Sequence, residues 1–121
     1  MSYKSCDGVY HPEPLTEHCE EVLKAPPGHF WITAPDDEGI RYIHMKLPSA
    51  RENGAYCAIP IREGGNGAGA NRGASGVQPW GWDGSLERPT LTPSIFHDMG
   101  RPTSSVAWHG HLQAGRFVGS P

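Results

Sequence analysis

Hydrophobic positions in this chain come in short runs separated by glycine and proline, a pattern typical of β-strands joined by turns. Residues 28–33 (GHFWIT) and 40–47 (IRYIHMKL) are two such runs, and residues 35–39 between them (PDDEG) are of types that favour turns. Together they predict a β-hairpin. A further strand is predicted over 55–62 (AYCAIPIR), where Pro60 indicates a sheet edge or a bulge because proline cannot donate to the ladder.

One short helix is predicted in the N-terminal arm, residues 1–27. Thr16 can cap its N-terminus, and the glutamates that follow suit the positive end of the helix dipole. Val22 and Leu23 are expected to pack inward, and the proline pair beginning at Pro26 ends the helix.

The last third of the chain is predicted to form strands or extended segments, with Asp83-Gly84 and Ala114-Gly115 as turns. Many short strands without a long amphipathic helix predict a mostly β fold. We expect one β-rich domain over residues 1–121. Its form is a small antiparallel β-sandwich or barrel, with a jelly roll as one arrangement that the pattern allows.

Composition and charge narrow the function classes. The chain holds 16 glycines and 12 prolines in 121 residues, and its net charge of −3 argues against a nucleic-acid-binding surface. No run of 18 apolar residues is present, so no membrane span is expected. The N-terminus lacks the apolar stretch of a signal peptide, and three irregularly spaced cysteines are expected to stay reduced.

Within the glycine-rich loop, residues 63–77, the stretch 64–76 contains no large apolar side chain that could offset the cost of ordering it. Its glycine spacing fits neither a dinucleotide fingerprint nor a phosphate loop. A loop of this length is typically functional or disordered. We treat it as a candidate interaction loop, with four polar or glycine positions as its contacts: Gly64, Asn66, Asn71 and Arg72.

Two groups of residues could bind a metal. His109 and His111 lie two apart, so on a strand they share one face, but no carboxylate follows closely. A second group has spacings that fit no standard zinc pattern: Cys6, His11, His18 and Cys19. Both are weak candidates, and no cofactor is expected.

Nucleophilic catalysis has little support. Ser94 does not lie in a G-x-S-x-G elbow, and Cys57 in mid-strand is expected to be a core residue. We therefore expect a protein that is not an enzyme.

The most informative stretch is 80–95, WGWDGSLERPTLTPSI. Trp80 and Trp82 lie two apart and are expected to face the same side of a strand, while Pro89 and Pro93 favour extended backbone. These tryptophans could form an aromatic binding platform or the core of a small domain. The core interpretation is preferred because aliphatic residues are few.

This stretch resembles the signature W-x-W-[DN]-G-x-x-[ED]-x-P-T-L-x-P-S-[IL] of a family of small proteins encoded by tailed bacteriophages and prophages. A second segment, WHGHLQAGRF at 108–117, is similar to the family's later [CW]-H-[SG]-x-[IL]-x-x-G-x-[IF]. The resemblance covers about residues 80–118 and implies phage origin without an established activity. The matching residues in the first part are Trp80, Trp82, Asp83, Gly84, Glu87, Pro89, Thr90, Leu91, Pro93, Ser94 and Ile95.

Phage origin leads to three expectations. The first is a virion protein, such as a capsid cement or decoration component, that contacts other phage proteins or further copies of itself. The second is a small factor that binds and inhibits a host protein in the cytoplasm. The third is a metal-binding module that uses His109 and His111.

Overall fold

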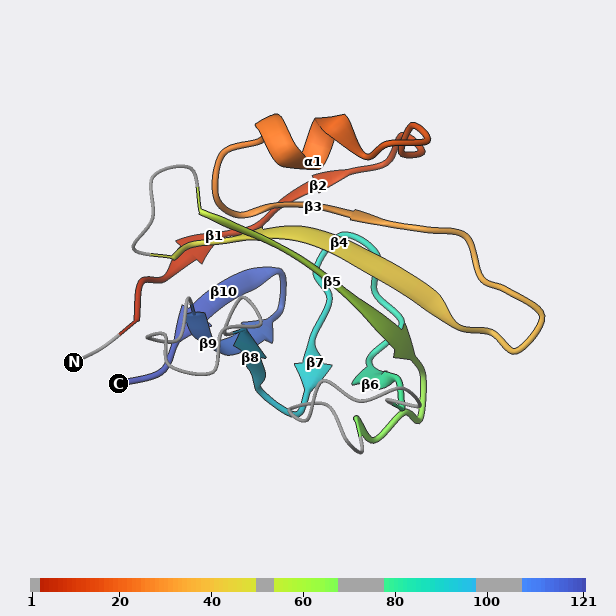
Figure 1. Cartoon of the computed structure of the whole chain (residues 1–121). Coiled ribbons are helices and arrows are strands. Elements are labelled where there is room, and N and C mark those ends of the chain that lie inside the picture. The colour runs from red at the N-terminus through yellow and green to blue at the C-terminus, as the bar shows by residue number, and fades with distance from the viewer. Residues whose placement is uncertain (1–2, 50–53, 68–77, 98–107) are drawn as a thin grey trace.

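The computed structural model describes residues 3–49, 54–67, 78–97 and 108–121. In these residues it contains one short helix and ten strands (Figure 1). In chain order they are β1 (Cys6–Asp7), β2 (Val9–His11), α1 (Glu20–Lys24), β3 (His29–Ile32), β4 (Arg41–Leu47), β5 (Ala55–Arg62), β6 (Trp80–Trp82), β7 (Leu91–Thr92), β8 (Ile95–His97), β9 (Trp108–Gln113) and β10 (Arg116–Gly119).

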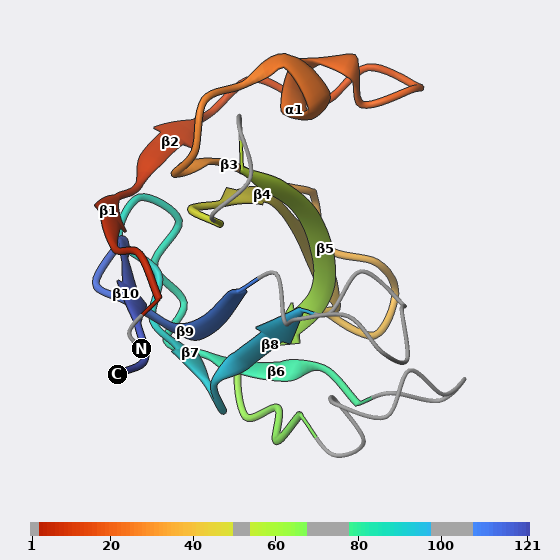
Figure 2. The same ribbon diagram turned by 60° about the vertical axis from the view of Figure 1, so that its left-hand side comes forward.

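The strands form two sheets. One has the order β2-β3-β4-β5-β6-β7, and the other has the order β1-β10-β9-β8. Figure 2 shows β4 and β5 as strongly curved strands that arch over β8 and β9. The prediction of a mostly β, sandwich-like fold with one short helix is thus confirmed. The larger sheet is mixed, however, because β2 pairs with β3 and β5 with β6 in parallel.

The longest pairing joins β4 and β5 over seven residue pairs, from Arg41↔Ile61 to Leu47↔Ala55. The strand predicted over 55–62 is confirmed as β5, and every second residue of it is buried. The predicted hairpin over 28–47 is confirmed as β3 and β4, which pair antiparallel. Pro60 pairs with Tyr42 of β4 on one side of β5. On the other side, the pairing of β5 with β6 begins only at Ile61.

The main core lies between the two sheets. Cys57 belongs to it, as expected, and burial raises the pKa of its thiol to about 12. Strands of both sheets supply its buried residues: Phe30, Ile43, Met45, Leu47, Ala55, Cys57, Ile59, Ile61, Trp80, Leu91, Ile95, Trp108, Leu112 and Phe117.

The opposite face of the larger sheet carries α1 (Figure 1). Val22 and Ala25 pack there on Trp31 in a second, smaller core. The Lys46 amino group donates hydrogen bonds to three carbonyls at the end of the helix, those of Val22 (3.1 Å), Leu23 (2.6 Å) and Ala25 (3.4 Å). This lysine is buried, and the bonds both satisfy its charge and fix the helix end.

Two details of the helix prediction were wrong. The N-cap is Cys19, in a left-handed conformation, and Thr16 instead donates to the Glu21 carboxylate through its backbone N–H (2.8 Å) and its hydroxyl (2.6 Å). Leu23 is 55% exposed because, on a helix of five residues, Val22 takes the inward position. Within the described residues, no helix is long and apolar enough to cross a membrane.

Burial along β4 leads to a direct test of the fold. Ile43 is fully buried and the adjacent Tyr42 is 46% exposed. Ile43→Ala should lower the free energy of unfolding by about 2–5 kcal/mol, because it leaves a cavity between the sheets. Tyr42→Ala, the matched control, should change it by no more than about 1 kcal/mol. Urea unfolding followed by tryptophan fluorescence measures both, and equal losses would contradict the assigned faces of β4.

Candidate functional site

The two signature tryptophans are used differently. Trp80 is buried in the core, as predicted, and its Nε1–H donates to the Ser94 carbonyl (3.4 Å). Trp82 is only partly buried. Its Nε1–H donates to the Ser85 carbonyl (2.9 Å), and the Arg41 guanidinium lies 5.5 Å from the centre of its ring. Both indole N–H groups therefore have partners within the fold.

Asp83 organises the turn that follows. Its Oδ1 accepts hydrogen bonds from the backbone N–H groups of Ser85 (3.1 Å) and Thr90 (3.2 Å). Gly84 has a φ of 87°, a left-handed conformation that favours glycine. The predicted Asp83-Gly84 turn is confirmed, and the carboxylate is used to hold it.

The two parts of the signature contact each other. The Gly115 N–H donates to the Pro89 carbonyl (3.0 Å), and the Ala114 N–H donates to the Thr90 hydroxyl (2.8 Å). Ala114 and Gly115 both have positive φ, as the turn joining β9 to β10 requires. The signature thus links the larger sheet to the smaller one. Among its other members, Leu91 and Pro89 are buried, whereas Glu87 and Pro93 are exposed.

His109 is tied into this linkage. Its Nε2 and the Ser94 hydroxyl share a hydrogen bond (3.1 Å), and the rings of Tyr3 and Phe96 lie 6.3 and 5.6 Å from its ring. His109 and His111 are both partly buried on β9. Among the residues that the structure describes, no group of three or more His, Cys, Asp or Glu side chains is arranged to hold a metal ion.

The structure does not bring together the residues of the second candidate metal group. Cys6 lies on β1 and packs against the main core, while Cys19 caps α1 and packs in the smaller core beside Trp31. His18 is exposed, and His11 lies on β2. The grouping by sequence therefore does not correspond to a spatial cluster.

The described part of the candidate interaction loop is held against the chain before β6. The Gly65 N–H donates to the Arg62 carbonyl (2.9 Å), and the Gly67 N–H donates to the Pro79 carbonyl (2.8 Å). Gly64 and Asn66 are exposed. Asn71 and Arg72 lie outside the described residues.

A polar cluster that the sequence did not single out lies on the outer face of the larger sheet. The parallel register of β2 and β3 places His11 beside Trp31, and their rings stack with centres 4.0 Å apart. His11 Nδ1 lies 2.9 Å from Glu13 Oε1, and His11 Nε2 lies 2.7 Å from His29 Nδ1. Because a carboxylate only accepts, His11 Nδ1 carries the proton, and in neutral His11 the Nε2 accepts from His29 Nδ1–H.

The protonation of this cluster is biased by its surroundings. Burial, together with nearby His11, lowers the pKa of the His29 imidazole below its ordinary value of 6.5. Hydrogen bonds from its own backbone N–H and from His11 lower the pKa of the Glu13 carboxyl. The cluster therefore combines an ionised carboxylate with a His29 that favours its neutral form.

A second hydrogen-bonded pair lies on the same face. His44 Nδ1 and the Tyr56 hydroxyl are 2.6 Å apart. Burial lowers the pKa of His44, and burial with the nearby Cys19 thiol raises the pKa of Tyr56 to about 12. The tyrosine therefore keeps its proton at neutral pH.

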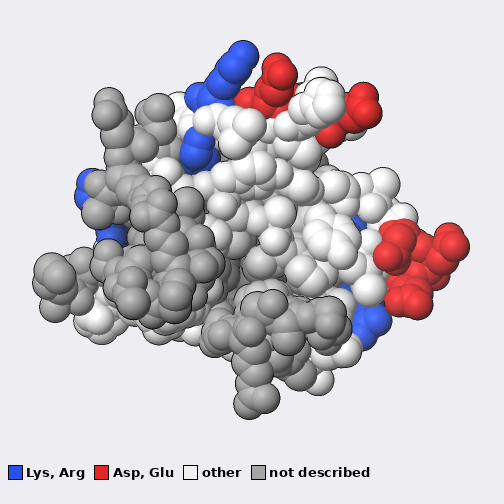
Figure 3. All heavy atoms as spheres, viewed as in Figure 1, with Lys and Arg blue, Asp and Glu red and all other residues white. Residues whose placement is uncertain are grey.

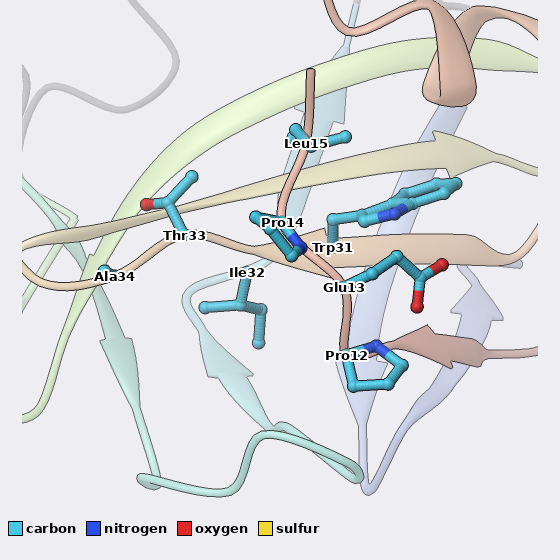
Figure 4. Close-up of a pocket in the computed structure, with 8 residues that line it drawn as sticks. All are labelled: Pro12, Glu13, Pro14, Leu15, Trp31, Ile32, Thr33 and Ala34. Carbon is cyan, nitrogen blue, oxygen red and sulfur yellow. The ribbon is translucent and has the colours of Figure 1, made fainter.

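Next to the histidine cluster lies an open groove of about 400 Å³. Residues 12–15 form one wall and residues 31–34 the other (Figure 4). Trp31, 4% exposed, lines it, and Trp31 Nε1 has no hydrogen-bond partner among the described residues. The sequence did contain a signal for this groove, since the prolines of HPEPL prevent residues 12–15 from continuing a ladder.

The lowered pKa values of His29 and His44 predict how stability depends on pH. An imidazole whose pKa is lowered by folding binds protons more readily in the unfolded chain. The stability it contributes is present above pH 6.5 and is lost as the pH falls through its folded value. We expect the free energy of unfolding, measured by urea titration, to change little between pH 7.5 and 6.5 and to decrease from pH 6.5 to 5.

Two variants control this pH experiment. His29→Asn should flatten the decrease, whereas His18→Asn, at an exposed position, should leave it unchanged. A stability that rises on acidification over this range would contradict the assignment.

The signature tryptophans supply a second test. Trp80→Ala should cost about 3–5 kcal/mol in the free energy of unfolding, because Trp80 fills the core. Trp82→Ala should cost less, because its part-exposed ring packs only at the margin of the core and loses one hydrogen bond and one cation–π contact besides. Guanidinium unfolding followed by circular dichroism measures both. A larger loss for Trp82 would show that we have reversed their roles.

Comparison of the chain with protein-family models, curated proteins and solved structures finds no match. The function must therefore be argued from the arrangement of its own residues. In that arrangement several polar side chains of the tryptophan segment are bonded within the fold, and the groove beside Trp31 is a surface open to a ligand.

Proposed function

We propose that this chain is an accessory protein of a tailed phage that acts through protein–protein contacts as a component of the virion, such as a capsid cement or decoration protein. The observation that carries the proposal is the open groove between residues 12–15 and β3, which combines an apolar lining with an unpaired strand edge. Surfaces of this kind bind extended protein segments.

The use of the signature segment supports the same interpretation. Its polar side chains are bonded within the fold: Asp83 to the turn, Thr90 to the Ala114 N–H, and Ser94 to His109. A structural role of these side chains would explain the resemblance to the phage family without a catalytic role for the signature. Recognition then falls to surfaces outside it, namely the groove and the exposed start of the glycine-rich loop.

Mass spectrometry of phage particles purified through a density gradient tests the proposal. We expect the chain in the particle at a fixed ratio to a head or tail protein, and its loss on mild denaturant washing before the capsid opens. If the chain is missing from particles and abundant early in infection, the virion role is wrong. A small factor that binds a host protein then takes its place.

A further inference from the structure

The edge of β3 is open on the side that faces residues 12–15. Parallel pairing with β2 ends at His11↔Trp31, and Pro12 and Pro14 have no N–H to continue it. Within the described stretch 3–49, no backbone hydrogen bond joins residues 12–15 to residues 32–34. Thr33 N–H donates to Tyr42 on β4, so the Ile32 carbonyl faces the opposite, open side, because backbone groups alternate along a strand.

The groove beside this edge is lined mainly by apolar side chains, with Glu13 and Thr33 as its polar members. Pro12, Pro14 and Leu15 form the far wall, and Trp31 forms part of the base (Figure 4). Trp31 Nε1–H is a buried donor without an acceptor among the described residues.

Acidic residues flank the groove on two sides. One group lies beside residues 12–15 and at the start of α1: Glu13, Glu17, Glu20 and Glu21. The other forms the β3–β4 turn just beyond Ala34: Asp36, Asp37 and Glu38. Figure 3 shows acidic side chains near α1 and, separately on the same face, at the β3–β4 turn. Together they are seven of the 13 acidic residues in the chain.

From these features we propose that the groove docks an extended, basic segment of a partner protein, which adds to the open backbone edge at 32–34, the last residue of β3 and the two residues after it. The segment places an apolar side chain against Leu15 and Trp31. Lysine or arginine residues on either side of it meet the two acidic groups. This inference deepens the proposed function by assigning the chemistry of the partner.

Charge decides between this occupant and the alternatives. A segment that bridges two acidic groups must carry positive charge, whereas a second copy of this chain brings a net charge of −3. The open edge favours an extended backbone over a helix, since strand addition supplies main-chain hydrogen bonds. A stretch of three residues spans about 10 Å. The docked core is therefore short, and its affinity depends strongly on the flanking charges.

Selection from a displayed library of random heptapeptides against the purified full-length chain tests the proposal. We expect enriched sequences with an apolar centre, lysine or arginine towards both ends, and no proline at the centre. Fluorescence anisotropy of the best synthetic heptapeptide then gives its affinity. Methylation of its central backbone nitrogens should weaken binding at least tenfold if it adds as a strand.

Variants of the chain locate the site. Ala34→Phe, at an exposed position that lines the groove, should abolish binding by filling it. Asp37→Lys combined with Glu38→Lys should weaken binding about tenfold or more at low salt, with a smaller effect at 0.5 M salt. Glu87→Lys, also exposed but outside the groove lining, is the matched control and should change affinity less than twofold. Unchanged urea midpoints show that the variants fold.

Three results would overturn the docking proposal: no enriched sequence, enrichment of acidic sequences, or binding that Ala34→Phe leaves intact. Self-association that Ala34→Phe abolishes, measured by sedimentation, would assign the groove to a second copy instead. The experiment is independent of the virion test. If the chain binds the peptide but is missing from particles, the docking proposal stands and the virion role is wrong. If the chain is in particles but binds no peptide, the virion role stands and the docking proposal is wrong.

Discussion

The pairing of β4 with β5 is the interaction on which the rest of the structure depends. Its seven residue pairs form a curved ribbon with two different faces. The inner face carries Ile43, Met45 and Leu47 into the core between the sheets. The outer face carries Lys46, whose amino group binds the carbonyls at the end of α1 and so holds the helix over Trp31. One alternating strand thereby positions both cores.

In the tryptophan–aspartate–glycine segment, polar side chains form hydrogen bonds that hold the fold. Asp83 accepts two backbone N–H groups, and the Thr90 hydroxyl accepts a third from Ala114. These bonds join a turn of the larger sheet to the β9–β10 hairpin of the smaller one. The core between the layers also contains two buried indoles, Trp80 and Trp108, which add large apolar surfaces to these local hydrogen bonds.

The outer face of the larger sheet has a different character. There His11 stacks on Trp31 and joins Glu13 to His29, so the start of residues 12–15 is held by polar contacts. Pro12 and Pro14 then turn this segment away from the β3 ladder. Because the histidine cluster and the groove share Trp31 and Glu13, protonation of the cluster and occupation of the groove act on the same residues.

Local pattern in the sequence determined the strands over 28–33, 40–47 and 55–62, the burial of Trp80 and Cys57, and the turns at Asp83-Gly84 and Ala114-Gly115. Each of these depends on alternation or on turn propensity between near neighbours. Local pattern wrongly predicted Thr16 as the N-cap and Leu23 as an inward-facing residue. The ends and the buried face of so short a helix depend on what it packs against.

Only the tertiary structure decided the parallel pairings, the contact between the two parts of the signature, and the cluster of His11, Glu13 and His29. His11 and His29 lie 18 positions apart, and they meet because β2 and β3 run side by side in one register. Sequence spacing grouped His11 with Cys6 and Cys19 instead. Partners between strands are chosen by sheet topology, which burial and pairing over the whole chain determine together, so neighbours in sequence could not reveal them.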